Sequence, residues 1–572
     1  MHEARRILLA ATDLLHRCDD CGAQVLRAID LYSGIGGWSA GLACAGIEVV
    51  EAYEIWPAAM RTYNANLGTD HRVSDVRKLR LEDLPEGISL VVGSPPCTEF
   101  SFSNRGGGGD LAEGLKDVVK FFEVVRHIGP TWWIMENVPR TAAMVRGGLD
   151  TPGHPLHEFR ELSPDIRILD LSDFGLPQAR ARCFIGVFPF DDLDDMQSHQ
   201  PRRTLGQAIA ALGGPDVVDP LWGVSLKRSQ LTEMEPELPL NAEQLRMNRE
   251  AKRFHPVYND MPFPDALDRP SRTVTATCTR VSRESIVVPA DEVQSVRRLT
   301  VRERATLQGF PITYQFYGNS HSQKVKMIGN AVPPLFTYMV GLAAQGRRGI
   351  RTPSGENLPP PLRMPNVLPE VTPPHAVSTA YPARRRFRAA LPGLRFKSGM
   401  RFQLSNEYDL DDAVRWSIQF FFGPSKDVRT VLLDNALHDR LDRMPMVSSA
   451  MWACRAQFEP VRTIVQRLTA QQMQRAWRQS EVGTGPYVLV DQLGQAGIAL
   501  THALTSACRT EVAEAVLSVC TDPRGLLASK QKLSQNAPAI LAGLVLGSWF
   551  NRLEWAADDM PSRPAKVAVT VG

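Results

Sequence analysis

Residues 89–101 read SLVVGSPPCTEFS, and the rest of the chain is organised around this stretch. The apolar run from Leu90 to Val92 predicts a short buried strand, which Gly93 and Ser94 end. Two prolines then stiffen the exit, because each ring fixes φ and removes a backbone donor. Open parallel sheets bind their ligands where such strands end. Cys97 follows the turn directly, so it is a candidate nucleophile rather than a small buried core residue.

The composition is that of a globular chain with several domains. The 572 residues are 43% hydrophobic and 22% charged, which predicts two to four domains. The net charge of +3 means that any basic surface must be local. Nine cysteines without a disulfide-framework spacing indicate a reducing compartment. Cys18 and Cys21 form a lone CxxC, a weak zinc signal, and we expect no metal site.

No stretch reads as long and apolar enough to span a bilayer, and residues 537–550 are too few. Residues 1–15 indicate a short helix rather than a signal peptide, since the segment contains acidic residues and no clear cleavage site, and 1–27 would form an N-terminal lead-in. We therefore expect a cytoplasmic protein, associated with the nucleoid, that has no membrane partner.

A glycine-rich turn and two acidic residues are the next candidate ligand-binding features. The glycine spacing does not match the dinucleotide-binding pattern, and a tight turn that binds no phosphate is the alternative. Residues 28–39 read AIDLYSGIGGWS, which predicts a strand, a glycine-rich turn and the start of a helix. The next strand, 48–53, ends at Glu54, where an acidic residue commonly holds ribose hydroxyls. Asp75 follows a third element and could accept from an adenine amine; a plain surface carboxylate is the alternative.

Two further stretches carry candidate polar groups. Residues 131–139 read TWWIMENVP, a buried strand that ends in Glu136, where apolar surroundings would suit proton donation. Residues 178–186 read QARARCFIG, whose alternation places Arg180 and Arg182 on one strand face; a solvated edge is the alternative. The four glycines at 106–109 indicate a candidate lid.

The second half of the chain changes character. Residues 190–295 lose the alternation of strands and helices. After this region, Thr300 and Glu303 have the spacing of a capping box, which predicts the start of a helix. Residues 351–382 are rich in proline, which predicts a linker. Beyond it, basic and aromatic residues precede a strand-like stretch at 416–422, and helical patterns follow from 432. This region suits either a nucleic-acid surface or a solvated edge strand.

Six motifs occur in order and together resemble the DNA cytosine-5 methyltransferase family across residues 28–342. They read DLYSGIGG (30–37), PPC (95–97), ENV (136–138), QARAR (178–182), RLT to QGFP (298–311) and GNAVPP (329–334). The resemblance implies an α/β fold: a Rossmann-like S-adenosylmethionine-dependent methyltransferase domain at 28–190, resumed at 298–350. A smaller target recognition domain at 191–297 would interrupt it. A mixed, mainly helical C-terminal extension at 383–572 lies outside the resemblance.

The resemblance also implies a covalent mechanism. Cys97 would attack carbon 6 of cytosine as a thiolate, and Glu136 would protonate ring nitrogen 3. Arg182 would hold the base carbonyl oxygen, and Arg180 would support the site. Carbon 5 would then take the methyl group of S-adenosyl-L-methionine, the expected cofactor.

The implied cofactor site draws on most of the motifs. Tyr32 would lie against the adenine, Glu54 would bind the ribose, Ile55 would pack on the adenine, and Asp75 would meet its amine. The remaining implied cofactor-binding residues are Ser33, Gly34, Gly36 and Gly37 in the glycine-rich turn, Pro95, and Asn330 on the methionine side.

The implied partner is double-stranded DNA, from which the target base must be flipped out. The implied DNA-binding residues are Ser101, Arg272, Thr273 and Val274. Thr98 stands where the family usually has glutamine, which leaves the contact made there open. Restriction or defence proteins are further expected partners, and residues 383–572 could bind DNA or such a partner.

Two other functions fit the same residues. A tRNA cytosine-5 methyltransferase would share the motifs, although the sizeable recognition region favours DNA. A non-catalytic DNA-binding regulator could keep the fold, although intact Cys97, Glu136, Arg180 and Arg182 argue against it.

Overall fold

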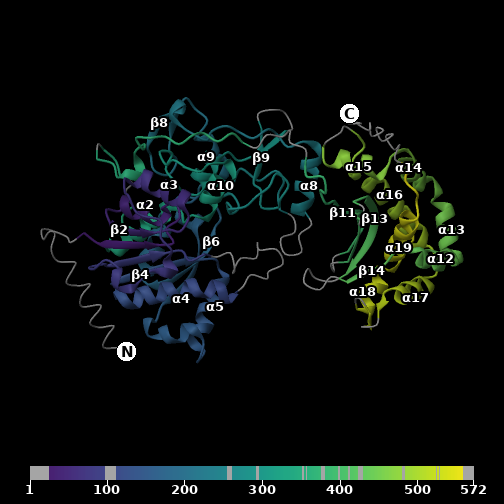
Figure 1. The fold of residues 1–572 in the computed structure, drawn as a ribbon, viewed down its shortest axis with the longest axis horizontal. Coiled ribbons are helices and arrows are strands. Elements are labelled where there is room, and N and C mark those ends of the chain that lie inside the picture. Colours follow the sequence, from purple (N-terminus) through teal and green to yellow (C-terminus); the bar gives the residue numbers. More distant parts are fainter. Residues whose placement is uncertain are drawn as a thin grey trace, which may run out of the picture. The chain divides into compact units, whose positions relative to one another are not determined.

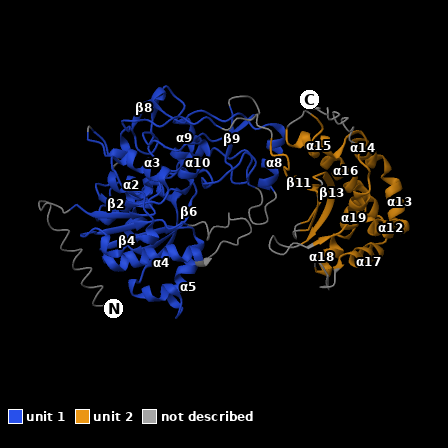
Figure 2. Cartoon of the chain, viewed as in Figure 1, with its two compact units in different colours: residues 1–376 blue, residues 377–572 orange. Residues whose placement is uncertain are grey.

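The structure is a computed structural model, in which the chain forms two compact units, residues 1–376 and 377–572 (Figure 2). Each unit has its own sheet and helices (Figure 1). Cys18, Cys21, Cys97, Thr98, Ser101 and the glycines at 106–109 lie outside the described residues. The structure describes residues 25–96, 111–253, 261–290, 295–350, 353–355, 357–374, 381–396, 400–409, 412–422, 429–479, 483–522, 525–526 and 529–557.

The sheet of the first unit has six strands in the order β2-β1-β3-β4-β6-β5. Its first four strands run parallel, and β6 is antiparallel to both of its neighbours. The chain order reverses at β1, since β2 lies on one side of it and β3 on the other, and such a reversal opens a crevice at the strands' carboxyl ends. The predicted Rossmann-like α/β fold is confirmed. The strands are β1 (Arg27–Leu31), β2 (Glu48–Tyr53), β3 (Leu90–Gly93), β4 (Trp132–Asn137), β5 (Asp165–Asp170) and β6 (Ala181–Val187).

Helices cover both faces of this sheet, as the near-continuous apolar strands require. Ile29, Leu31 and Val91 pack with Phe121 and Phe122 of α4 on one face. Ala28, Leu90 and Val92 pack on the other face with residues of α2 and α11. The helices are α2 (Gly37–Cys44), α3 (Pro57–Leu67), α4 (Leu111–Ile128), α5 (Arg140–Asp150), α9 (Val301–Leu307), α10 (His321–Asn330) and α11 (Pro334–Ala344), with 3-10 turns η1 (Val76–Lys78), η2 (Leu81–Asp83), η3 (Pro155–Leu162), η4 (Leu171–Phe174) and η6 (Pro360–Leu362).

One helical stretch corrects a sequence expectation. His321–Ala344 is long and apolar enough to cross a membrane by length and composition, although no such stretch was expected. Buried residues make up 94% of its most apolar window. The stretch is two helices, since α10 ends at Asn330 and α11 begins at Pro334, and both pack in the core of the first unit.

The region between β6 and α9 consists of short elements joined by long loops. Its predicted loss of alternating strands and helices is seen across the described residues. The predicted capping box at α9 is present, because the Thr300 hydroxyl accepts from the Glu303 amide at 3.0 Å and the Glu303 carboxylate accepts from the Thr300 amide at 2.7 Å. The elements of this region are α6 (Phe190–Gln197), α7 (Leu205–Ala210), β7 (Asp216–Val218), β8 (Ser225–Lys227), η5 (Arg228–Gln230), α8 (Ala242–Arg253), β9 (Val287–Pro289) and β10 (Val296–Arg298).

The proline-rich stretch, expected to be a linker over 351–382, is packed against the first unit through much of its length. Thr313 donates its hydroxyl hydrogen to the carbonyl of Pro361 at 2.7 Å, and the buried Lys324 ammonium donates to the carbonyl of Glu370 at 2.7 Å. Leu362 is buried. Two carbonyls of this stretch, one of them from a proline, thus accept from side chains elsewhere in the first unit.

The second unit is a four-stranded antiparallel sheet, in the order β11-β12-β13-β14, with helices on one face (Figure 2). The predicted mixed, mainly helical extension is confirmed. The apolar segment 537–550 falls in α19, a buried core helix. The elements are β11 (Arg388–Arg395), β12 (Arg401–Tyr408), β13 (Val414–Phe422), β14 (Arg429–Val431), β15 (Thr521–Asp522), β16 (Gly525–Leu526), α12 (Asn435–Asp442), α13 (Pro445–Ala453), α14 (Arg455–Arg467), α15 (Ala470–Trp477), α16 (Pro486–Thr505), α17 (Arg509–Val519), α18 (Lys530–Gln535) and α19 (Ala537–Asn551).

Candidate active site

The glycine-rich turn after β1 leads into α2 in a conformation that needs glycine. Gly34 has a φ of 56° and Gly36 a φ of 86°, both in the left-handed region. A Cβ on Gly37 would lie 2.1 Å from the Val332 carbonyl oxygen, so only glycine lets α2 approach the turn before α11. The turn therefore presents backbone amides at the start of a helix, where they suit a ligand with negative charge.

Glu54 closes this turn from the neighbouring strand. Its carboxylate accepts from the Gly34 amide at 2.9 Å and from the Trp56 amide at 2.6 Å. Burial raises the pKa of Glu54 above its usual value. Ile55 is 62% exposed beside it, so a large apolar side chain stands open to a ligand. The structure thus brings together the predicted ribose-binding and adenine-packing residues at one edge of the sheet.

A partly buried ion pair connects Tyr32 with the segment that carries Asp75. The Tyr32 hydroxyl donates to the Asp117 carboxylate at 3.2 Å. Arg77 holds the same carboxylate through Nε and Nη2, each at 2.7 Å. The Asp75 carboxylate in turn accepts from the Arg77 amide at 3.1 Å. Sequence reasoning missed Arg77 and Asp117, because nothing local marks residues 40 positions apart as a pair.

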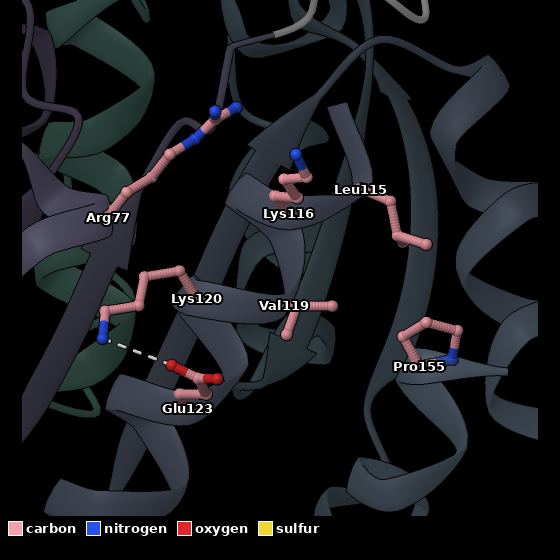
Figure 3. A pocket seen from close by; sticks show the side chains of 7 residues that line it. All are labelled: Arg77, Leu115, Lys116, Val119, Lys120, Glu123 and Pro155. Atoms are coloured by element: carbon pink, nitrogen blue, oxygen red, sulfur yellow. Dashed lines mark ion pairs between the residues drawn. The ribbon is translucent and has the colours of Figure 1, made fainter. Parts of the chain in front are cut away.

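A pocket of about 550 Å³ lies beside Arg77 on the outer side of α4 (Figure 3). Lys120 forms an ion pair with Glu123 at 3.2 Å there, and the Lys116 ammonium lies 2.6 Å from Glu113. None of its lining residues is a predicted site residue. The lining residues are Arg77, Leu115, Lys116, Val119, Lys120, Glu123 and Pro155.

The turn that leads to Cys97 is held at its start. The Ser94 hydroxyl accepts from the Trp38 indole at 3.0 Å, and the Pro95 carbonyl accepts from the Asn137 side chain at 3.0 Å. Asn137 ends β4, the strand beside β3, and its side-chain oxygen accepts from the Thr141 hydroxyl at 2.9 Å. The proline turn is therefore tied to the strand that carries Glu136.

Glu136 and Arg182 lie together. Arg182 Nε is 2.9 Å from Glu136 Oε1, and the two side chains are only 14% and 9% exposed. They come from the antiparallel strands β6 and β4, in which Glu136 pairs with Phe184. The site thus places a carboxylate and a guanidinium side by side, next to the strand that leads to Cys97.

Arg180 has different surroundings from Arg182. β6 begins at Ala181, so Arg180 precedes the strand and is buried. Its guanidinium donates to the Val274 carbonyl at 3.3 Å and to the Ala331 carbonyl at 3.1 Å. Asn330, beside Ala331, is exposed at the end of α10. Arg180 therefore joins the region between β6 and α9 to the turn before α11.

Gln178 strengthens the same junction and was not singled out from the sequence. Its side-chain oxygen accepts from the Val274 amide at 2.7 Å, and its nitrogen donates to the Gln308 side chain at 2.8 Å. Three motifs that are distant in the sequence meet at this junction, namely 178–182, 298–311 and 329–334. Their buried polar side chains hydrogen-bond to one another or to the backbone there.

The described DNA-binding candidates lie at this junction as well. Arg272 donates from Nε to the Asp265 carboxylate at 2.6 Å, and the Thr273 hydroxyl donates to the Ala179 carbonyl at 2.9 Å. Val274 is buried. Contact of these residues with DNA stays a prediction.

The turn also contains polar groups that suit a bound ligand. The hydroxyl of Ser33 is buried and has no hydrogen-bond partner among the described residues. It lies one residue before Gly34, whose amide donates to Glu54. A buried, unsatisfied hydroxyl costs free energy unless a ligand pairs with it. Together with the open face of Ile55, this arrangement fits S-adenosylmethionine.

More than half of the chain is similar to known proteins. Residues 26–345 match the family described as C-5 cytosine-specific DNA methylase. The Type II methyltransferase M.HgiDI of Herpetosiphon aurantiacus is 26% identical over 335 residues, covering 56% of this chain and 94% of the relative. M1.HphI of Haemophilus parahaemolyticus is 30% identical and covers 56% and 86%. The crystal structure of S. pombe Dnmt2 methyltransferase is 18% identical with a TM-score of 0.40, covering 56% and 98%.

Proposed function

The chain belongs to the C-5 cytosine-specific DNA methylase family, and from that premise we propose that it methylates carbon 5 of cytosine in duplex DNA through a covalent adduct with Cys97. The contact between Glu136 and Arg182 is the observation that carries this proposal. Asn137, the next residue, holds the carbonyl of Pro95, two residues before Cys97. In this proposal the acid lies on β4, the forked cation lies on β6, and the nucleophile follows the turn after β3.

In the proposed reaction Cys97 attacks carbon 6 of the flipped cytosine, forming a carbon–sulfur bond. Attack at carbon 6 displaces the π electrons of the bond between carbon 5 and carbon 6. Glu136 donates a proton to ring nitrogen 3, which neutralises the charge that develops there and leaves carbon 5 as the nucleophilic carbon of an enamine. Arg182 donates to the base carbonyl oxygen and orients Glu136. After methylation, loss of the proton from carbon 5 restores the double bond and expels the Cys97 thiolate.

Enzymes of this family take the methyl group from S-adenosylmethionine, whose sulfonium makes that methyl electrophilic. In our proposal Glu54 binds the ribose hydroxyls, because its carboxylate is held in place by two backbone amides and keeps further lone pairs. Tyr32 and Ile55 flank the adenine, and Asp75 accepts from its amine. Ser33 and the amides of the glycine-rich turn face the methionine end.

We place the enzyme in a modification role, since the relatives M.HgiDI and M1.HphI are both named Type II methyltransferases. Such a role would pair it with a restriction or defence protein that recognises the same site. The region at 191–297 would choose the sequence, with Arg272, Thr273 and Val274 at its junction with the catalytic domain and Ser101 on the catalytic side.

The proposal is tested by labelled methyl transfer to mixed-sequence duplex DNA and to tRNA, followed by bisulfite sequencing of the DNA. We expect 5-methylcytosine in one sequence context of the DNA and no transfer to tRNA. Label in tRNA alone would contradict the proposed substrate, and no label with either would contradict the proposed activity. The Cys97→Ala variant, which lacks the proposed nucleophile, is the negative control for methyl transfer.

A further inference from the structure

The two faces of the sheet in the second unit have opposite character. Val414, Trp416, Ile418, Phe420 and Phe422 of β13 are buried. Helices lie against this face, where the Trp416 indole donates to the Ala470 carbonyl and Asn551 accepts from the Ile418 amide (Figure 2). The intervening residues of β13 therefore point to the other face, because neighbouring side chains alternate along a strand.

Strand register shows what this other face presents. Arg388 lies opposite Ser405, which lies opposite Ser417. One row further Glu407 faces Arg415, and at the other end Arg395, Arg401 and Phe421 form a row. The neutral residues between are Ala390, Gln403 and Gln419. The middle of the face is thus polar, with Gln403 and Ser405 buried and Ser417 and Gln419 half-buried, and both ends are basic.

Arginine dominates the charge of this face. Arg386, Arg388, Arg395 and Arg415 are exposed, and the Arg401 guanidinium lies 5.1 Å over the ring of Phe421. Burial and the charge of Arg388 lower the pKa of Arg401, as expected when like charges gather. Within the described strand positions of this face, Glu407 is the acidic residue. We call the five arginines the arginine face.

The charge is also unevenly shared along the chain. Residues 377–572 hold 24 Lys and Arg against 17 Asp and Glu, although the whole chain has a net charge of only +3. The first unit is therefore slightly acidic, and the basic character belongs to the extension. A local basic surface attracts polyanions at long range.

We infer that the arginine face binds the phosphate backbone of duplex DNA outside the target site. Forked guanidinium groups pair well with phosphate, and contacts to phosphate hold a duplex without reading its bases. DNA is the occupant that charge complementarity favours, since the family to which the chain belongs acts on DNA. The face then holds DNA near the catalytic unit and raises its effective concentration there.

The test removes three charges from the face and three from elsewhere in the same unit. The first variant is R386Q/R388Q/R415Q. Its matched control is R440Q/R443Q/R467Q, which changes three exposed arginines: Arg440 in α12, Arg443 directly after α12, and Arg467 at the end of α14. Both are full-length proteins, and glutamine keeps part of the side-chain stem. The measurement is the Kd for a 40-base-pair duplex without a target site, over a series of salt concentrations.

We expect the face variant to bind at least tenfold more weakly, with its salt slope smaller by about 2 to 3, since each lost phosphate contact removes about 0.9. The control should bind within about twofold of the parent protein, because its charges lie elsewhere. Equal losses in both variants, or none in either, would overturn the inference. So would a change of oligomeric state confined to the face variant with unchanged DNA affinity, since the occupant would then be a second copy of the chain. Methylation of a short saturating duplex should persist in both variants, which separates this inference from the proposed activity.

Discussion

Arg182 Nε lies 2.9 Å from Glu136 Oε1 across two neighbouring strands, with both side chains nearly buried. In the proposed reaction this pair would let a guanidinium and an acid act on two adjacent positions of one pyrimidine ring. It also leads to a prediction for Glu136→Gln. Glutamine can keep the contact with Arg182 but cannot donate a proton as an acid, so kcat should fall about 100- to 1,000-fold. Single-turnover methylation measures this, and an unchanged rate would remove Glu136 from the chemistry. DNA affinity is the control and should stay within a few fold.

The two arginines near the site should respond differently to the same substitution. The Arg180 guanidinium donates to two backbone carbonyls with different nitrogens, and the single ammonium group of Arg180→Lys cannot reach both. The free energy of unfolding should therefore fall by about 2–3 kcal/mol. Arg182→Lys keeps a charge beside Glu136 and should change stability by less than about 1 kcal/mol while lowering kcat strongly. Thermal unfolding and methylation of both variants test this. Equal stability losses would show that both arginines serve the fold alone.

Glu54→Gln should weaken cofactor binding with little effect on the bound enzyme. The Glu54 carboxylate accepts from the backbone N–H groups of Gly34 and Trp56 with its two oxygens, whereas a glutamine side chain has one accepting oxygen. The variant therefore loses one of these hydrogen bonds, and the proposed ribose site loses its negative charge. We expect KM for S-adenosylmethionine to rise about tenfold with kcat within about threefold. Glu48→Gln, at the exposed first position of β2, the strand that Glu54 follows, is the control and should not change KM. Loss of kcat without a change in KM would contradict the assignment.

Asp30 should make stability depend on pH. Burial raises its pKa from 3.8 to about 7, opposed by the hydrogen bond that Ser39 donates at 2.6 Å. Between pH 3.8 and about pH 7 the Asp30 carboxyl group is ionised in the unfolded chain and protonated in the folded protein. Folding therefore takes up a proton in this range, and the free energy of unfolding falls as pH rises. Above about pH 7 both states are ionised and the loss is complete. Asp30→Asn cannot ionise, so the parent protein should lose about 3 kcal/mol relative to this variant between pH 5 and pH 8.

Calorimetry at the two pH values measures the difference, and Asp70→Asn, at an exposed position, is the control. A parent protein and an Asp30→Asn variant with parallel pH dependence would show that Asp30 titrates normally.

The central strands β1, β3 and β4 of the catalytic sheet could be predicted because they are largely apolar and buried on both faces. Leu90 to Val92 and the turn after them are set by local chemistry, as is the capping box of Thr300 and Glu303. The site residues at the ends of these strands follow from the topology, which brings Gly34 and Glu54 together although 20 residues separate them.

Pairs made by tertiary packing could not be predicted in this way. Alternation placed Arg180 and Arg182 together, but β6 begins between them and they have different partners. The contact of Arg77 with Asp117 joins segments whose local patterns are ordinary. The proline-rich stretch has a linker's composition, yet Leu362 and two backbone carbonyls fasten it to the first unit.

The central claim is that Cys97 bonds to carbon 6 of cytosine, and the most direct measurement uses duplex DNA with fluorine in place of hydrogen at carbon 5 of the target base. Fluorine cannot leave as a proton, so after methylation the Cys97 thiolate cannot be expelled. The account predicts a protein–DNA complex that survives denaturation, forms only with S-adenosylmethionine, and has its mass increase on the peptide containing Cys97. Cys97→Ala should form no such complex and should transfer no methyl group. Methyl transfer by Cys97→Ala, or a stable adduct on another residue, would contradict the account.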